Sequence, residues 1–432
     1  MRACGAWEPS SILGHRPKNM IQKQKGTRDF YPEEKRTQNY IFEIWKSVAE
    51  SFGYEEINGP TMEPIDLYKK SGSEIPEQIY TLKDKSDNEF ALRPELTPTI
   101  ARMISQKQGI KRPIKWYAIP DCYRYEAPQS GRLRQFAQFN LDLLGTETTT
   151  SDAEVITVLV ELLKAFGFTK NDVFVRISNR KVIESFLDYL TISNKKEIAK
   201  LIDKYDKLSP EGFQESLTEL IGSKKAQEIS SFLKIRNISD IKFDFDEKGK
   251  QGLKELNELF TKLKAFGVLE YCRLDLSIMR GFDYYTGTIF EAYDTNKKFR
   301  ALAGGGRYDN LVDFLGGEPC PGIGFGMGDV ILELLLQSKN KLPQLKKEIK
   351  YYIAPVNDFV LNTAIEIAQK LRKYNNVELE VTSRKLSKQF EYASEIGAEK
   401  IVIVGEKDLE NKQVTIRDLE NGKEEKENIK NL

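Results

Sequence analysis

Apolar residues recur every three or four positions between Lys35 and Phe52, which is the spacing of one face of an amphipathic helix. The apolar positions on that face are Ile41, Ile44, Trp45, Val48 and Phe52. Gly53 follows directly, and glycine is favoured just beyond a helix C-terminus. The pattern therefore predicts a helix that ends before Gly53.

Strand-like runs dominate the next part of the chain. IKWYAIPDCYRYE begins at residue 114 and LRQFAQFNLDLLG at residue 133, and the polar linker APQSGR joins them. Because the linker contains a proline and a glycine between two runs rich in aromatic and β-branched residues, the pair predicts an antiparallel hairpin. A third strand is predicted in RGFDYYTGTIFE, from Tyr284 to Phe290, and PGIGFGMGDVILELLL predicts a strand that feeds a helix.

Two segments interrupt or follow these strands. From about residue 180 to 266 the chain carries charged amphipathic helical patterns, such as NKKEIAKLIDKY, which predict a helical insertion in a β-rich domain. Lys339 to Lys350 is lysine-rich and contains Pro343, as expected of a linker. Beyond it, strand and helix patterns alternate to the C-terminus and predict a small α/β domain.

Length and composition set the class of protein. A chain of 432 residues with 40% hydrophobic content exceeds a single core, so two or three domains are expected. The net charge of +1 gives no general sign of a polyanionic partner. Four cysteines without a CxxC pair, at Cys4, Cys122, Cys272 and Cys320, argue against a zinc ribbon or a disulfide scaffold and favour the reducing cytoplasm.

The first twenty residues lack the apolar core of a signal peptide and predict a flexible leader. No run elsewhere approaches the ~18 apolar residues of a membrane span, so no membrane association is expected. The leader contains the only histidine, His15. Histidine-based triads and most zinc enzymes are therefore disfavoured, and no metal site is expected in the protein.

The hairpin carries polar side chains two residues apart, which share one face of a strand. The members of this predicted face are Arg124, Glu126, Arg132, Arg134, Gln138 and Asp142. A solvated sheet face would explain the pattern. Several guanidinium groups on one face would also suit a polyphosphate, because each binds phosphate oxygens in a fork-like geometry and keeps its charge.

Two further stretches carry candidate chemistry. The run PGIGFGMGD puts four glycines on one face of a strand, where either a flat ligand or a closely packed element would fit. It matches neither GxGxxG nor a Walker loop. LRPELTPTIAR supplies Glu95 and Thr97 at a strand end; the threonine would serve as a helix cap, and the glutamate could hold a substrate ammonium group.

Together these motifs resemble the class II aminoacyl-tRNA synthetases and, within them, the histidyl-tRNA synthetases. The motifs that carry the resemblance, in the family's order, are KGTRDFYPEE, LRPELT, YRYEAPQSGRLRQFAQF, RGFDYYTGTIFE, GGGRYDNL and RKLSKQFEYASEIGA. The hairpin arginine motif is common to class II enzymes, whereas RGFDYYTG is specific to the histidine enzymes and their relatives. The resemblance covers nearly the whole chain from about Lys25.

The resemblance implies an α+β fold: a six-stranded antiparallel sheet with flanking helices and a helical insertion near the tRNA acceptor arm, followed by an anticodon-binding α/β domain. Its implied boundaries are residues 21–338 for the catalytic domain and 348–432 for the anticodon-binding domain. It also implies a homodimer built partly through Lys35 to Pro60. The implied reaction converts L-histidine and ATP, with Mg²⁺, to histidyl-adenylate and then transfers histidine to tRNA(His).

The resemblance further implies roles for single residues. Arg124 and Arg280 would bind the α-phosphate of ATP, and Arg132 would reach toward its terminal phosphates. Glu126 would contact the adenine and Phe136 would stack on it. The histidine-binding residues would be Glu95, Thr97, Gln138, Asp142, Tyr284 and Tyr285. Gln129, at the hairpin tip, would touch the tRNA acceptor end.

One position departs from the class II pattern. Ile331 stands where many class II enzymes have an arginine that covers the adenine, so either another group takes that place or ATP binds weakly.

Two relatives share the catalytic fold without charging tRNA: a regulatory subunit of ATP phosphoribosyltransferase and synthetase-like domains fused to kinases. The C-terminal α/β pattern and the intact RGFDYYTG argue against the first, and the lack of a kinase segment argues against the second. Specificity for threonine or proline is disfavoured because the zinc ligands are missing and because Asp142 and Tyr285 suit an imidazole ring.

Overall fold

The computed structural model describes residues 21–70, 78–107, 109–279 and 284–432. The chain divides into two compact units, one up to Leu342 and one from Pro343 onward. The larger unit contains the polar hairpin and the glycine-rich strand, and the smaller one contains the alternating C-terminal elements. Each unit is described by itself below.

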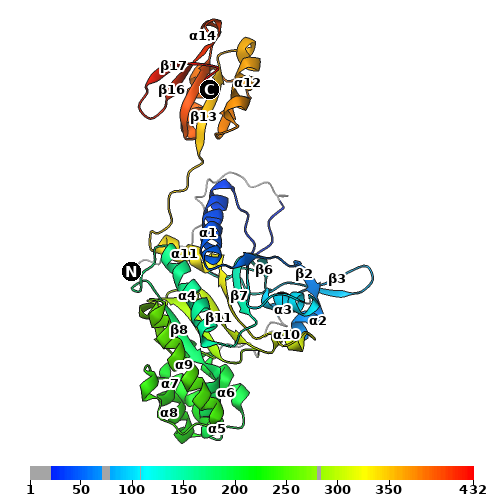
Figure 1. Ribbon diagram of the computed structural model, residues 1–432, viewed down its shortest axis with the longest axis vertical. Helices are drawn as coiled ribbons and strands as arrows, with labels where there is room; N and C mark the ends of the chain where they lie inside the picture. The colour runs from blue at the N-terminus through cyan, green and yellow to red at the C-terminus, as the bar shows by residue number, and fades with distance from the viewer. Residues whose placement is uncertain (1–20, 71–77, 108, 280–283) are drawn as a thin grey trace. The chain divides into compact units, whose positions relative to one another are not determined.

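A large mixed sheet forms the centre of the first unit (Figure 1). In the described part of the chain it has nine strands, of which six neighbours pair antiparallel: β5 (Ile114–Ala118), β7 (Gln135–Leu144), β12 (Gly322–Gly328), β11 (Ala303–Tyr308), β10 (Thr288–Asp294) and β8 (Val173–Asn179). β1 (Glu55–Glu56) and β9 (Cys272–Leu274) extend the two edges in parallel pairing, and β6 (Asp121–Tyr123) pairs with the start of β7. The predicted antiparallel sheet and its hairpin are confirmed.

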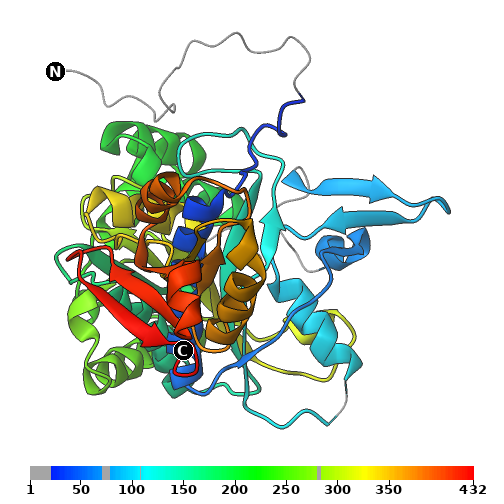
Figure 2. The ribbon, with the colours of Figure 1, turned by 90° about the horizontal axis from the view of Figure 1, so that it is seen from above.

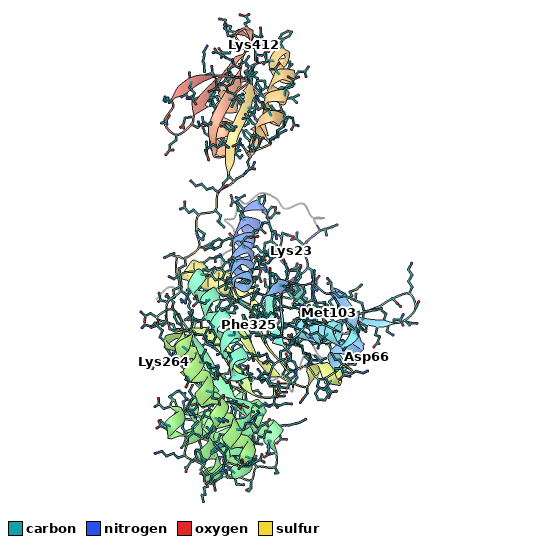
Figure 3. The ribbon with its side chains drawn as sticks, in the orientation of Figure 1. Lys23, Asp66, Met103, Lys264, Phe325 and Lys412 are labelled. Atoms are coloured by element: carbon teal, nitrogen blue, oxygen red, sulfur yellow. The ribbon has the colours of Figure 1, made fainter. Side chains whose placement is uncertain are left out.

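Three helices contribute to the apolar core on one face of this sheet: α1 (Pro32–Ser51), α4 (Thr149–Ala165) and α11 (Asp329–Ser338). Trp45 of α1, Phe139 of β7 and Phe325 of β12 form a chain of rings with centroid separations of 5.6 and 5.8 Å. Phe325 is labelled within this core in Figure 3. The helix predicted from the apolar spacing is thus α1, which packs through the predicted side.

The opposite face of the sheet packs against α3 (Thr97–Gln106) and the short α10 (Leu311–Phe314). A small sheet with the order β2 (Met62–Pro64), β4 (Glu89–Leu92) and β3 (Tyr80–Lys83) lies beside α2 (Ile65–Lys70). Figure 2 shows the β3–β4 hairpin projecting from this unit. β7 turns Phe139, Leu141 and Leu143 into the first core, so its alternate residues face this second side.

Helices fill the segment between β8 and β9. They are α5 (Arg180–Tyr189), α6 (Lys195–Ile202), α7 (Pro210–Ile221), α8 (Ser223–Phe232) and α9 (Glu247–Ala265). The rings of Phe186 and Phe232 stack at 3.8 Å in their core. Arg176 of β8 binds Asp206 of this helical segment at 2.5 Å and Glu291 of β10 at 2.7 Å, which ties the segment to the sheet.

The second unit is a separate α/β layer. Its sheet has the order β14 (Val377–Leu379), β13 (Ile349–Pro355), β15 (Ala398–Val404), β16 (Gln413–Asp418) and β17 (Glu424–Asn428). The first three strands are parallel and the last two antiparallel. α12 (Leu361–Leu371), α13 (Leu386–Glu395) and α14 (Glu406–Glu410) complete it. Across the described parts of both units, no helix combines the length and the apolarity that crossing a bilayer requires.

The strand predicted from Tyr284 begins later, at Thr288. Tyr284 and Tyr285 are both buried in the same cluster as Tyr308, so their side chains do not alternate between two faces as in a strand. The backbone first joins the sheet region through the N–H of Thr286, which donates to the carbonyl of Arg307 at 2.8 Å. Arg280, at the head of the predicted strand, lies outside the described residues.

Candidate active site

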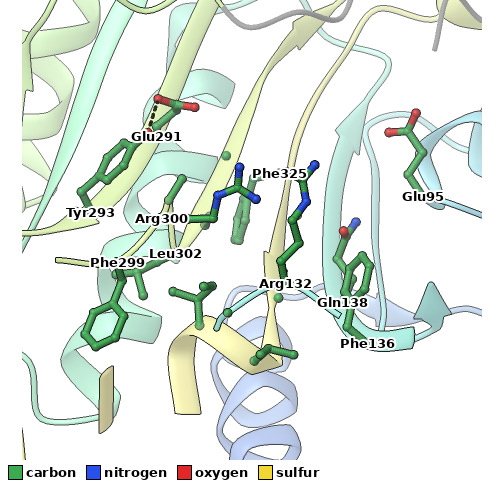
Figure 4. Close-up of a pocket in the computed structure, with 18 of the residues that line it drawn as sticks. Glu95, Arg132, Phe136, Gln138, Glu291, Tyr293, Phe299, Arg300, Leu302 and Phe325 are labelled. Atoms are coloured by element: carbon green, nitrogen blue, oxygen red, sulfur yellow. Dashed lines mark hydrogen bonds between the residues drawn. The ribbon is translucent and has the colours of Figure 1, made fainter. Parts of the chain in front are cut away.

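A cavity of about 880 Å³ opens on the second face of the large sheet (Figure 4). Its walls come from the link between β4 and α3, the β6–β7 hairpin, the turn between β10 and β11, and the junction of β12 with α11. The residues predicted for the site that line it are Glu95, Thr97, Arg124, Glu126, Gln129, Arg132, Phe136, Gln138, Tyr284 and Tyr285. Segments nearly 200 residues apart in the sequence therefore meet in one cavity.

Cations and one aromatic ring gather at the hairpin end of the cavity. The guanidinium carbon of Arg124 lies 5.1 Å from the centroid of the Phe136 ring, and its Nε donates to the carbonyl of Pro94 at 3.0 Å. Arg132 forms an ion pair with Glu126. Burial, together with repulsion from Arg300 and Arg124, lowers the pKa of Arg132 to about 10. This end of the cavity suits an anion beside a planar ring.

Arg134 does not belong to this group, which corrects part of the predicted polar face. β6 ends at Tyr123 and β7 begins only at Gln135, and the Arg134 N–H donates to the Gly26 carbonyl at 2.8 Å, so the strand spacing is lost on both arms near the loop. The guanidinium of Arg134 lies 4.4 Å from the Tyr125 ring, and its Nε donates to the Glu126 carbonyl at 3.0 Å. Arg134 thus braces the hairpin from outside the cavity.

Carboxylates and phenols define the other end. Tyr284 donates from its hydroxyl to Oε2 of Glu95 at 3.3 Å, and its ring lies 4.8 Å from that of Tyr285. Burial and the nearby Glu95 charge raise the pKa of Tyr284 well above its usual value, so the phenol stays protonated. Gln138 donates from Nε2 to Asn140 at 2.9 Å. A ligand with a cationic group and a polar ring would find matching partners here.

Asp142 lies directly beneath this end, next to Tyr308, which lines the cavity. The Tyr308 hydroxyl donates to Oδ1 of Asp142, whereas Oδ2 is buried without a hydrogen-bond partner among the described residues. Burial raises the pKa of Asp142 to about 7; the Tyr308 hydrogen bond opposes this rise and the Glu95 charge adds to it. A buried carboxylate oxygen of this kind is costly unless a ligand supplies a donor.

The glycines of β12 make room for these side chains. Gly324 pairs with Asp142 and Gly328 with Gln138 in the β7–β12 ladder. A methyl carbon added to Gly326 would lie 2.7 Å from Nε2 of Gln138, and one added to Gly324 would collide with Oδ1 of Asp142. Close packing is therefore observed, with the polar side chains of β7 packed against the glycines. Gly324, Gly326 and Gly328 also line the cavity, so the alternative of a ligand on this face stays open.

Two details of the predicted site need correction or addition. Thr97 is the first residue of α3, and the capping position is Leu96 without a side-chain hydrogen bond, so the predicted capping role is wrong. The sequence interpretation also missed Asn140, Tyr308 and Arg300, which line the cavity. Asn140 continues the spacing of Gln138 and Asp142 and could have been found from it. Arg300 lies in a turn, where no periodic pattern exists.

The donor groups near the site do not form a resident metal site among the described residues. In the stretches of chain that the structure describes, no group of three histidine, cysteine, aspartate or glutamate side chains gathers closely enough to hold an ion. Cys122, Cys272 and Cys320 are buried free thiols. Burial raises the pKa of the first two to about 12, so these thiols remain protonated.

Comparison with known proteins gives the family. The family model described as histidyl-tRNA synthetase matches residues 26–328, and the model described as an anticodon binding domain matches residues 350–432. The histidine–tRNA ligase of Leptospira biflexa is 39% identical over 92% of this chain and 93% of its own length. That of Thermococcus kodakarensis is 38% identical over 94% of this chain and 95% of its own length.

Solved structures agree with these relatives. The crystal structure of histidyl-tRNA synthetase from Nostoc sp. PCC 7120 superposes with a TM-score of 0.80 at 26% identity and covers 96% of this chain and 100% of that one. A structure from Bacillus halodurans, titled as an ATP phosphoribosyltransferase regulatory subunit/histidyl-tRNA synthetase, covers 90% of this chain and 99% of that one at 26% identity, with a TM-score of 0.74. The resemblance drawn from the motifs is confirmed, and the chain belongs to the histidyl-tRNA synthetase family.

Proposed function

We propose that this chain is a histidine–tRNA ligase, which activates L-histidine with ATP to histidyl-adenylate and transfers the histidine to the 3′ end of tRNA(His). The observation that carries the proposal is one continuous cavity with cations and Phe136 at one end and Glu95, Tyr284 and Gln138 at the other. ATP and an amino acid could lie end to end in it. Membership of the family supports the same reaction.

The cationic end is assigned to ATP. Arg124 would bind the α-phosphate together with Arg280, while Arg132 would reach the terminal phosphates. Phe136 would stack on the adenine, and Glu126, which Arg132 holds in place, would accept a hydrogen bond from the adenine amino group. The closeness of Arg124 to Phe136 supports this assignment, because the two would contact neighbouring parts of one nucleotide.

The other end is assigned to histidine. Glu95 would accept from the ammonium group, with Thr97, Gln138 and Tyr284 as further polar contacts around it. Asp142 would accept from an imidazole N–H through Oδ2, and Tyr285 would lie against the ring. The buried, unpartnered Oδ2 among the described residues supports a ligand that brings a donor to this point.

The activation step needs positioned charge rather than a base. A carboxylate oxygen of histidine attacks the α-phosphorus, a new P–O bond forms, and the bond to the β-phosphate oxygen breaks with release of pyrophosphate. No proton leaves the nucleophile, since a carboxylate is already ionised at neutral pH. Negative charge grows on the α-phosphate oxygens, where fixed guanidinium groups stabilise it without reorganisation. In the second step a terminal ribose hydroxyl of tRNA attacks the histidyl carbonyl, an ester bond forms, and the bond to the AMP phosphate breaks, with the hydroxyl proton passing to that phosphate as AMP leaves. Gln129 would contact that acceptor end.

Four further features belong to the proposal. Mg²⁺ would reach the site bound to ATP phosphates and supply counter-charge there. Residues 21–338 would form the catalytic domain, with the helical insertion at about 180–266, and residues 348–432 would read the anticodon.

Two copies would pair partly through α1 and β1, since β1 is an edge strand of the described sheet. The enzyme would work in the cytoplasm, and a solution mass of twice 49.6 kDa would support the dimer.

The decisive experiment is exchange of labelled pyrophosphate into ATP, run with each of the twenty amino acids. Exchange should depend on histidine alone. Activity with another amino acid would overturn the specificity, and no exchange with any of them would overturn the activation step. Charging of tRNA(His) transcripts, with a tRNA of different anticodon as control, then tests the transfer.

A further inference from the structure

The first turn of α11 brings no cation to the cavity. It contributes Val330 and Ile331, while Asp329 is turned away and accepts from Arg28 at 2.5 Å and from the Ala137 N–H at 3.1 Å. Ile331 is buried and packs against Gly131 of the hairpin so closely that a methyl carbon on that glycine would collide with it. The arginine that many class II enzymes have at this place is thus replaced by an apolar contact that closes the hairpin onto α11.

A cation enters the same space from a different segment. Arg300 lies in the turn between β10 and β11, is exposed, and lines the cavity. Figure 4 shows its guanidinium turned toward that of Arg132. Within the part of the chain that the structure describes, Arg300 makes no hydrogen bond or ion pair, whereas Arg132 is paired with Glu126.

Strand register explains why Arg300 can reach this place. Gly328, at the end of β12, pairs with Gln138 near the start of β7, and Met327 pairs with Ala303 at the start of β11. Three segments therefore leave the same end of neighbouring strands: the hairpin with Arg132, the first turn of α11 and the turn with Arg300. A side chain three residues before β11 and one three residues after β12 start from neighbouring strand ends.

The guanidinium groups of Arg132 and Arg300 face the same space, and an anion between them would be stabilised by both. Repulsion between Arg300 and Arg132 is one of the causes that lower the pKa of Arg132, and an anion would remove that repulsion. Among the described residues, Glu126 is the carboxylate that forms an ion pair with Arg132. A terminal phosphate of ATP carries the charge and the oxygen geometry that two guanidinium groups bind bidentately.

We propose that Arg300 is an ATP-binding residue that holds the terminal phosphates together with Arg132. The proposal rests on the proposed function only for the identity of the nucleotide as ATP. It assigns Arg300 to the phosphates rather than to the adenine face. The two assignments differ in which nucleotides feel the loss of the side chain.

The test compares Arg300→Ala with wild type and with a matched control, Lys297→Ala. Lys297 lies in the same turn, lines the same cavity and carries the same charge, but its Nζ donates to Asp206 at 2.7 Å instead of facing Arg132. Binding of ATP and of AMP to the full-length protein is measured without histidine. We expect Arg300→Ala to weaken ATP binding about 10-fold or more, the effect of losing a charged hydrogen bond, and to leave AMP binding within about twofold. Lys297→Ala should change neither, and Arg300→Lys should restore part of the ATP affinity.

Each other result overturns the assignment. Equal weakening of ATP and AMP would put Arg300 on the adenosine portion, and no change in either would remove it from the site. A loss of ATP affinity in Lys297→Ala as large as in Arg300→Ala would reduce the effect to general charge. Histidine-dependent exchange by the wild type is read separately, so its absence would contradict the proposed function while the ATP and AMP comparison still decides the role of Arg300.

Discussion

Asp142 on β7 lies directly opposite Gly324 on β12, and its carboxylate fills the space that a side chain at position 324 would occupy. Tyr308, from β11 on the far side of β12, donates its hydroxyl to the same carboxylate. Two strands thus reach across a third to build one end of the cavity. The absence of side chains on that face of β12 is what permits it.

Gly324→Ala should therefore damage the histidine end selectively. The added methyl group collides with Asp142 Oδ1 and lies 2.6 Å from the carbonyl oxygen of Leu141, so it displaces the carboxylate and the strand that carries it. The KM for histidine should therefore rise about 10-fold or more, as expected when a charged hydrogen bond is lost. The KM for ATP should change little, because the cationic end stands on the hairpin. Steady-state exchange kinetics measure both values. A larger change in the ATP constant than in the histidine constant would contradict the proposed division of the cavity.

Asp142→Asn should change how stability depends on pH. Burial raises the pKa of Asp142 from 3.8 to about 7, so the folded protein binds this proton more tightly than the unfolded chain does. Between about pH 4 and pH 7 the unfolded chain loses the proton first, and the contribution of Asp142 to stability falls as the pH rises, by up to about 4 kcal/mol. The asparagine variant lacks this term. Its melting temperature should exceed that of the wild type more at pH 7.5 than at pH 5.

A melting-temperature difference that is the same at both pH values would mean that Asp142 does not titrate in this window. The comparison is made without ligands, because a bound histidine would alter the charge state of the same carboxyl group. Tyr308 and Glu95 are the groups that contribute to its pKa besides burial. Tyr308→Phe, which removes the hydrogen bond to the carboxylate, should raise the pKa of Asp142 further and steepen the wild-type trend.

Arg124→Ala and Arg134→Ala form a pair that tests the corrected hairpin face. Arg124 lines the cavity, whereas Arg134 stacks on Tyr125 outside it. Loss of Arg124 should lower the exchange rate about 100-fold or more, since it removes a preorganised cation from the proposed α-phosphate site. Loss of Arg134 should cost less than about tenfold, through looser positioning of the Glu126 backbone. Equal losses would restore the single polar face that the sequence predicted.

Arg280→Ala should lower histidine-dependent exchange by about 3 kcal/mol in transition-state free energy while leaving the fold intact. The reason is the same as for Arg124: a cation placed beside the α-phosphate stabilises charge that appears only during attack. Circular dichroism and the melting temperature serve as controls for folding. Exchange at a near wild-type rate in this variant would remove Arg280 from the catalytic residues.

The elements with a clear period could be predicted from the sequence. The face of α1 with Trp45, the two arms of the hairpin and the bare face of β12 each follow from spacing alone. The sequence-based predictions are wrong where the regular spacing of apolar and polar residues ends. Tyrosine is favoured in strands, yet the side chains of Tyr284 and Tyr285 both pack with Tyr308 before β10 begins. Burial in this cluster outweighs the local strand propensity.

The site shows the same limit. Glu95, Thr97 and the hairpin residues could be placed in one cavity by resemblance to a family, but not by spacing, since the segments that meet there are far apart in the chain. Arg134 looks equivalent to Arg132 in the sequence and differs from it because the return arm is not yet a strand at residues 133 and 134, where the Arg134 N–H donates to the Gly26 carbonyl. Arg300 gives no sequence signal at all, and only the strand register brings it to the cavity.

The hairpin, α11 and the β10–β11 turn leave the sheet at the same end of its strands, and this has an evolutionary consequence. A cation needed at that end can be carried by a side chain of any of the three segments. A lineage can therefore lose the cation from one segment and gain it on another without rebuilding the sheet. The Asp142 end has no such freedom, because each of its groups is locked to its neighbours by pairing across β12. Drift in this family should therefore be wider at the positions that bring a cation to the terminal phosphates from this end of the sheet than at those that select the amino acid.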